Sequence, residues 1–292
     1  MKTIIFPTDL SKTADNALEY AVALALALKA KLYAIYVHRP DLIVQGIPVD
    51  TAYFQLVPVP DEIIQKMNHL KQKLGNIAGL NFHTQIKDGF LDETILELAE
   101  QKNSGLIVMG TQGAHDALSV MLGSNTSRIL ERKEFPVLAV PAAYTGGIME
   151  GSNFVFATDF KDINDWEIME PFRALAFAKK ATVNLFYAHQ GTEEKEWLEF
   201  EKETYYEFQS YFEGVNVELH KSHKGNVVQA VEDFAHKKNA ALVMMIAHHR
   251  NWLGDLFHHS VTKEMSLSTK VPFLTLPDVK PEINLSSSMK MM

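Results

Sequence analysis

Cysteine is absent from the 292 residues, which excludes disulfides, thiolate catalysis and cysteine-ligated zinc. No apolar run reaches the roughly 20 residues that cross a bilayer, and the nearest, AVALALALKA at 21–30, contains Lys29. Positive charge is also scarce, because 28 basic against 36 acidic residues give a net charge of -8. This balance argues against nucleic-acid and membrane partners. The apolar run in MKTIIFPTDLS is too short for a signal-peptide core, so we expect a cytoplasmic protein.

The chain contains two diverged copies of one pattern. TIIFPTDLS at 3–11 resembles NFVFATDFK at 153–161, and ALALKAKLYAIYVH, which ends at His38, resembles ALAFAKKATVNLFYAH, which ends at His189. Further matches follow in the same order, as expected of a duplicated domain. The sequence therefore predicts domains at 1–143 and 152–280, joined by the glycine-rich stretch 142–153, with a disordered tail at 281–292.

Each copy alternates short apolar runs with helical patterns. In the first copy such runs occupy 3–6, 32–37, 106–109 and 137–140. Continuous apolar runs indicate strands buried on both faces, as in a parallel sheet. A helix with Ser11 or Thr13 as its N-cap is expected after the first run. The alternation predicts two doubly wound α/β domains. Pro171 falls in the first expected helix of the second copy and should kink that helix or delay its start.

Two loops of the first copy have residues suited to a nucleotide. Pro7-Thr8-Asp9 follows the first strand, and Gly110-Thr111-Gln112-Gly113 follows the strand at 106–109. In doubly wound sheets, ligands bind beyond the carboxyl ends of the strands, where the strand order reverses. Glycines let backbone amides approach a phosphate, and an acidic residue such as Asp9 accepts a hydrogen bond from a ribose hydroxyl.

Gly123-Ser124 stands just before a helix expected at 125–131. Helix N-termini present unpaired amides that attract anions, and Ser124 and Thr126 add hydroxyl donors. Gly-x-x-Gly, nine residues and Gly-Ser resembles the ATP-binding motif of the universal stress protein family. The first and last strands, within FPTDLS at 6–11 and FPVLAVP at 135–141, are also similar to those of that family.

The resemblance covers nearly the whole chain as a tandem of two such domains. It implies, for each, an adenine nucleotide alpha hydrolase-like fold with a five-stranded parallel sheet in the order 3-2-1-4-5. It also implies an ATP ligand with Mg²⁺ or Mn²⁺, with Asp9 at the ribose and Val37 against adenine. The implied ATP-binding residues are Pro7, Thr8, Asp9, Val37, Met109, Gly110, Gly113, Gly123, Ser124, Asn125 and Thr126.

The second copy lacks these glycines. Ile246, His249 and His259 stand where the first copy has Gly110, Gly113 and Gly123. Bulky side chains there predict a degenerate partner domain that binds no ATP. A histidine group comprises His248, His249, His258 and His259. One interpretation is a metal or anion site, and the other is a solvated polar loop.

The motifs favour a nucleotide-binding regulatory module of the stress response over an enzyme. The loop lacks the Gly-Lys-Ser/Thr ending of a P-loop, and no water-orienting residue is recognisable, so we expect hydrolysis to be slow or absent. Two alternatives stay open: a slow ATP-consuming enzyme, and a scaffold that binds no nucleotide and acts through its surfaces. The sequence identifies no protein partner.

The last strand of each copy predicts how the copies meet. Phe135–Pro141 and Val271–Pro277 are matched apolar segments, and the inferred order puts each at a sheet edge. An open apolar edge invites uncontrolled pairing. We therefore expect the two edges to pair within one chain as a pseudo-dimer, with a further homodimer left open. The glycine-rich linker is expected to be flexible enough to permit this.

Overall fold

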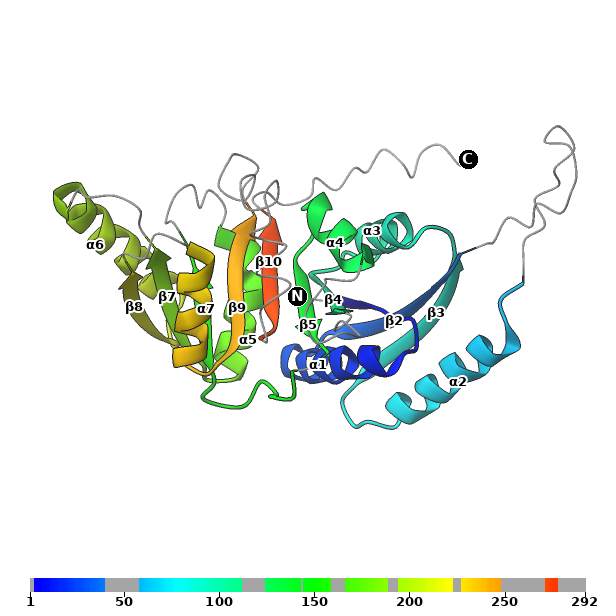
Figure 1. Ribbon diagram of the computed structural model, residues 1–292. Coiled ribbons are helices and arrows are strands. Elements are labelled where there is room, and N and C mark those ends of the chain that lie inside the picture. Colours follow the sequence, from blue (N-terminus) through cyan, green and yellow to red (C-terminus); the bar gives the residue numbers. More distant parts are fainter. Residues whose placement is uncertain are drawn as a thin grey trace, which may run out of the picture.

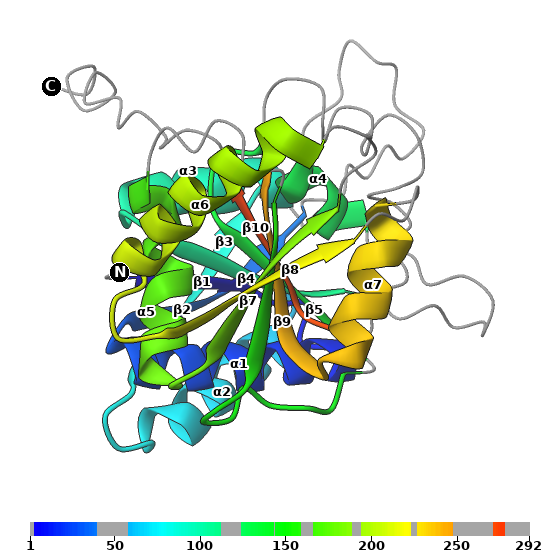
Figure 2. The same cartoon turned by 90° about the vertical axis from the view of Figure 1, so that its left-hand side faces the viewer.

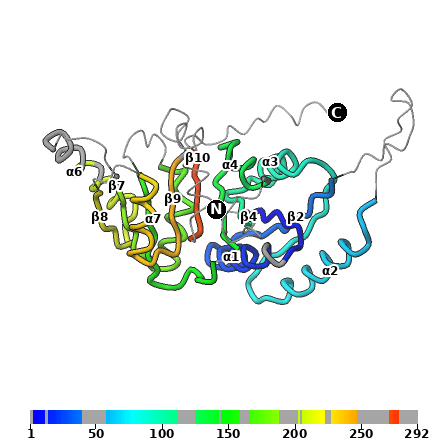
Figure 3. The backbone as a smooth tube through the Cα atoms, in the orientation of Figure 1, coloured from blue at the N-terminus to red at the C-terminus, as the bar shows by residue number. Residues whose placement is uncertain are grey.

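The computed structural model describes residues 3–39, 58–111, 124–142, 144–158, 166–188, 194–222, 227–247 and 271–277. Within these residues, two α/β halves lie side by side and share one sheet (Figures 1 and 3). Its ten strands follow the order β3-β2-β1-β4-β5-β10-β9-β6-β7-β8. No helix in the described part of the chain is long and apolar enough to span a bilayer. The tail expected at 281–292 lies outside the described residues.

The first half has the predicted alternation of strands and helices. Its elements are β1 (Thr3–Pro7), α1 (Lys12–Leu28), β2 (Lys31–His38), α2 (Asp61–Gly75), β3 (Asn81–Asp88), α3 (Leu91–Gln101), β4 (Leu106–Thr111), α4 (Ser124–Arg132) and β5 (Val137–Pro141). Ser11 is the N-cap of α1, and its side chain accepts a hydrogen bond from the amide of Ala14 at 3.3 Å. All the strand pairs within this half are parallel, in the order 3-2-1-4-5. The predicted fold is confirmed.

The second half repeats this order with a shorter first helix. Its elements are β6 (Asn153–Ala157), the 3-10 helix η2 (Trp166–Met169), α5 (Glu170–Ala178), β7 (Thr182–Ala188), α6 (Glu194–Tyr211), β8 (Asn216–Ser222), α7 (Val227–Lys237), β9 (Ala240–Ala247) and β10 (Phe273–Pro277). Pro171 lies in the first turn of α5, where a backbone donor is not needed. The predicted late start is confirmed, since α5 has 9 residues against 17 in α1.

The helices form two layers, one on each face of the sheet. Under α1, α2, α5 and α6, a single hydrophobic cluster runs through both halves. On the other face, α3 and α4 cover one cluster and α7 covers a separate one. Figure 2 shows how strongly the strands fan out, with α5 and α7 on opposite sides of the sheet. Within the described residues, the two halves therefore share a common core on one face of the sheet.

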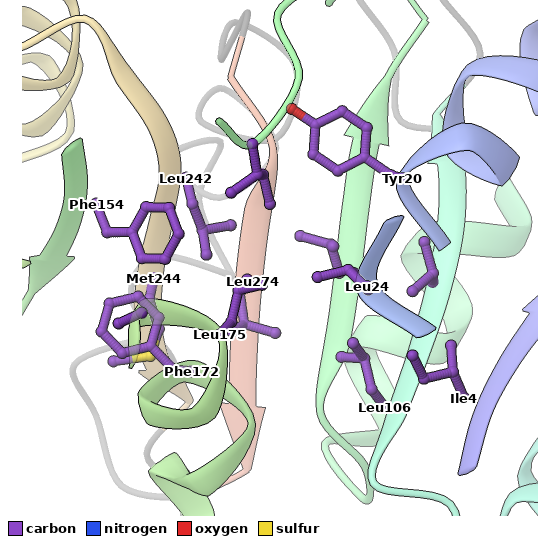
Figure 4. Close-up of a cluster of buried hydrophobic side chains, with 14 of the residues drawn as sticks. Ile4, Tyr20, Leu24, Leu106, Phe154, Phe172, Leu175, Leu242, Met244 and Leu274 are labelled. Atoms are coloured by element: carbon purple, nitrogen blue, oxygen red, sulfur yellow. The ribbon is translucent and has the colours of Figure 1, made fainter. Parts of the chain in front are cut away.

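The seam between the halves is an antiparallel pair of β5 and β10. Leu138 lies opposite Leu274, with Ala139 opposite Phe273 and Val137 opposite Thr275. The predicted pairing of the two last strands is confirmed. Figure 4 shows the shared cluster beside this seam, with Leu24 of α1 facing the side chains of β9, β10 and α5. Neither last strand is left as an open edge.

The glycine-rich connection between the halves is docked on α1. Asn16 donates from Nδ2 to the carbonyl oxygens of Pro141 at 2.8 Å and Tyr144 at 2.7 Å. Tyr20 donates from its hydroxyl to the carbonyl of Gly146 at 2.5 Å and packs edge-on against Tyr144. Burial raises the pKa of Tyr20, so its hydroxyl stays a donor. The connection thus permits the pairing of β5 and β10 as expected, and α1 supplies hydrogen-bond partners for part of its backbone.

A polar network is built into the second half around the fully buried Asn184 of β7. Asn184 Nδ2 donates to the carbonyl of Phe154 at 3.2 Å, and Oδ1 is 3.0 Å from His220 Nε2. His220 Nε2 is also 3.2 Å from Glu218 Oε2, which accepts from Lys238 Nζ at 3.0 Å. Because both neighbours of Nε2 are acceptors, this nitrogen carries the proton.

The network predicts that the free energy of unfolding depends on pH. Burial and, next, the Lys238 charge lower the pKa of His220 in the folded protein. As the pH falls through about 6.5, the unfolded chain takes up the proton first, so the free energy of unfolding decreases until the lower folded pKa is reached. His220→Gln keeps a side-chain donor without titrating, so we expect it to remove this decrease. Urea unfolding at pH 8 and pH 5.5 measures it, and an unchanged pH dependence in the variant would contradict the assignment.

Candidate functional site

The candidate site lies at the carboxyl edge of the first half, where the strand order reverses between β1 and β4. β1 pairs with β2 on one side and with β4 on the other, with Ile5 opposite Ile107. Continuing this register puts Pro7 at the level of Met109. The loops after β1 and β4 therefore leave the same edge from neighbouring strands, as the sequence predicted.

The loop after β1 is held in place by its own side chains. The amide of Thr8 donates to the carbonyl of Ile35 at 2.9 Å, and Thr8 Oγ1 accepts from the amide of Leu10 at 3.0 Å. Asp9 Oδ1 accepts from the amide of Ser11 at 2.9 Å. Leu10 has a φ of 61°, which this bonding accommodates. Thr8 is buried and Asp9 is exposed, so the Asp9 carboxylate is accessible to a ligand.

The end of β4 is tied to the first turn of α4. Met109 is buried, whereas Gly110 is partly exposed. Thr126 is 2% exposed and donates from Oγ1 to the carbonyl of Gly110 at 3.2 Å. This bond ties α4 to β4, and the predicted part of Thr126 as a phosphate donor stays a prediction. Asn125, in the first turn of α4, is exposed.

The structure describes the remaining predicted positions to different extents. Val37 is a partly buried residue of β2 that packs on the cluster under α3. Ser124 is the first residue of α4, although its side chain is not described. Gly113 and Gly123 lie outside the described residues, so their part in the site stays a prediction.

The second half has the same backbone arrangement at this edge, but a bulky side chain stands at one position where the first half has glycine. The amide of Thr158 donates to the carbonyl of Phe186 at 3.1 Å, as Thr8 does to Ile35 in the first half. Ile246, at the place of Gly110, is 3% exposed and lies opposite Leu276, as Gly110 lies opposite Val140. The His248, His249, His258 and His259 group lies outside the described residues, and within those residues no three potential ligands gather into a metal site.

Sequence reasoning missed the loop after β3. The amide of Gly89 donates to the carbonyl of His38 at 3.0 Å, which joins this loop to the end of β2. Phe90 is 56% exposed, and the guanidinium carbon of Arg39 lies 5.6 Å from its ring centroid. The available signal was a glycine followed by a large apolar residue directly before a helix.

Comparison with known proteins gives matches in both halves. The sequence model of the universal stress protein family matches residues 1–141 and 174–277. Two universal stress proteins of Methanocaldococcus jannaschii are 32% identical over 139 residues and 26% identical over 153 residues. Each match covers 48% of this chain, and they span 81% and 94% of the respective relatives.

A crystal structure of a universal stress protein from Archaeoglobus fulgidus has a TM-score of 0.66 with this chain, at 18% identity. The alignment covers 94% of this chain and 95% of that one. A putative universal stress protein from Pseudomonas aeruginosa is similar over 95% of this chain, with a TM-score of 0.65 and 18% identity. These likenesses extend the shared fold over both halves.

Proposed function

The chain belongs to the universal stress protein family, and from that premise we propose that its first half binds one ATP molecule as a regulatory ligand while its second half binds none. The observation that carries the proposal is the difference between Gly110 and Ile246 in the same backbone arrangement. Gly110 is the last residue but one of β4, beside the strand that leads to Asp9, whereas the buried Ile246 side chain fills the matching place.

The roles that we propose for residues of the first half follow from their positions at the carboxyl edge of its sheet. The exposed Asp9 carboxylate accepts from the ribose, and Val37 lies against the base. The glycine loop and the N-terminus of α4 receive the phosphates, since backbone amides and the helix dipole favour anions there. Thr126 positions α4 through its bond to the Gly110 carbonyl.

A divalent cation, Mg²⁺ or Mn²⁺, fits as a companion of the phosphates. The described residues form no dedicated cluster of three ligands, so the cation would be held mainly by phosphate oxygens and water. The proposal assigns the protein to the cytoplasm and treats it as a binding module with slow or absent hydrolysis.

Direct analysis of the full-length protein tests the proposal against its rivals. We expect denatured, freshly purified protein to release ATP, detected by mass spectrometry, and calorimetry to give one site per chain. Rapid release of AMP or ADP on incubation favours the enzyme, and no bound nucleotide with no calorimetric signal favours the scaffold. Two equivalent ATP sites per chain would contradict a degenerate second half.

Asp9→Ala is expected to weaken ATP binding about 10- to 150-fold, because a charged hydrogen bond to the ribose contributes about 1.5–3 kcal/mol. Asp9→Asn keeps an oxygen for the amide of Ser11, so it separates loss of charge from collapse of the loop. Asp15→Ala is the matched control, since Asp15 is an exposed acid in the first turn of α1. Calorimetric titration measures all three, and equal losses in the Asp9→Ala and Asp15→Ala variants would count against a ribose contact.

A further inference from the structure

We propose that Phe90, together with Arg39, is the stacking platform for the nucleobase, an inference that rests on the proposed function. The pair stands at the ends of β2 and β3, whose register puts His38 opposite Asp88. It therefore lies at the same carboxyl edge as Asp9 and Gly110. In this parallel sheet β2 separates β1 from β3, so the loops after β1 and β3 are about 10 Å apart at a strand spacing of roughly 4.8 Å. A nucleoside bridges such a span with its ribose at one loop and its base at the other.

The loop that carries Phe90 is rigidly built. Gly89 has a φ of 146°, and an added Cβ would come within 2.6 Å of Thr94 Oγ1. Its amide is bonded to the carbonyl of His38, and the amide of Thr94 donates to the carbonyl of Phe90 at 2.9 Å. The backbone of Phe90 is thus fixed between β2 and α3.

Within the described residues, the fold gives little reason for a phenylalanine at position 90. It is the N-cap of α3, a position that favours Ser, Thr, Asp or Asn, and it makes no side-chain capping bond. Its side chain is 56% exposed and so contributes little to the core. A serine or aspartate would serve the helix better. An exposed aromatic ring at a helix cap points to an aromatic ligand.

Arg39 adds a second group to the platform on which a base can stack. Its guanidinium lies over the Phe90 ring at 5.6 Å, within the range of a cation–π contact. Guanidinium planes and phenyl rings are both surfaces on which bases stack, without preference for one base. The next residue, Leu91, packs with Val37 on the same cluster under α3, so the platform adjoins the residue proposed to face the base.

Phe90→Ala is expected to weaken ATP binding about tenfold, in line with the effect of removing an aromatic partner from a stacked base. Inorganic tripolyphosphate, which has no base, should bind the variant and the parent equally. Tyr206→Ala is the matched control, since Tyr206 is an aromatic residue of α6 that is 65% exposed. It should leave both affinities unchanged. Calorimetry on the full chain measures each pair.

Phe90→Trp gives a second readout that does not depend on affinity. We expect ATP to quench the fluorescence of the introduced indole more strongly than tripolyphosphate does, with the parent protein as the baseline. If the parent binds ATP while Phe90→Ala retains full affinity and the introduced indole is not quenched, the platform is overturned and the proposed function stands. If the parent binds no ATP, both fail. An equal loss of ATP and tripolyphosphate affinity in Phe90→Ala would also overturn the platform, because it would show a general disturbance of the edge.

Discussion

Leu138→Lys is expected to lower the free energy of unfolding by more than about 4 kcal/mol, in the range reached when an unpaired charge enters a core. Leu138 is 1% exposed and lies opposite Leu274 across the seam. Both side chains belong to the cluster that runs under α1 and α5. A lysine there places its ammonium within a cluster of buried apolar side chains.

Both halves should loosen together in this variant, because the disturbed cluster belongs to both. Hydrogen exchange resolved by peptide measures the effect, and protection should fall in β6 and β9 as well as in β1 and β4. Leu26→Lys is the control, since Leu26 on α1 is 37% exposed and a lysine there can reach water. Loss of protection confined to the first half would show that the seam does not couple the two folding units.

Gly110→Ile is expected to weaken ATP binding at least 100-fold, or about 2.8 kcal/mol at 1.4 kcal/mol per tenfold. The substitution gives the first half the residue that the second half has at this position. A β-branched side chain suits a strand, and Ile246 occupies the matching register opposite Leu276, so β4 should still form. The loss arises because the side chain occupies the space where the backbone would approach a phosphate.

Calorimetry measures the loss in Gly110→Ile, and circular dichroism with thermal unfolding checks that the variant is folded. Gly75→Ile is the matched control, since an added Cβ at Gly75 at the end of α2 meets no atom within 4 Å. It should bind ATP as the parent does. Retained binding in folded Gly110→Ile would remove the main support for a site that only the first half possesses.

Much of the fold was predictable because strands that are buried on both faces of a parallel sheet have continuous apolar sequences. The apolar run at 106–109 becomes β4, and the late start of α5 follows from the missing donor of Pro171. The loop at Asp9 and the end of β4 were correctly placed at one edge, because the ends of neighbouring parallel strands meet there, but Gly110 and Thr111 belong to β4 and not to the loop after it. The hydrogen bond of Thr126 to the Gly110 carbonyl was not predictable, since it spans 16 residues and a hydroxyl can donate to many acceptors.

The contact made by the loop after β3 could not be predicted from the sequence, for a different reason. Arg39 and Phe90 come together only because β2 and β3 pair, and neither residue belongs to a spaced motif. The docking of the connection on α1 is similar, since Asn16 bonds to carbonyls 125 and 128 residues away. Backbone donors and acceptors carry no residue-specific signal, so a glycine-rich stretch looks flexible until its partners are known.

The amino-acid order alone determined the duplication, the α/β alternation and the unequal glycines of the two copies, because each is a local pattern of apolar or small residues. It also indicated that the last strands would pair, since an apolar edge needs a cover. Only the tertiary structure decided how deeply the halves are joined. The antiparallel β5–β10 pair brings α1 and α5 into contact on one face, and the apolar side chains there merge into a single core. On the other face, within the described residues, α4 and α7 cover separate clusters.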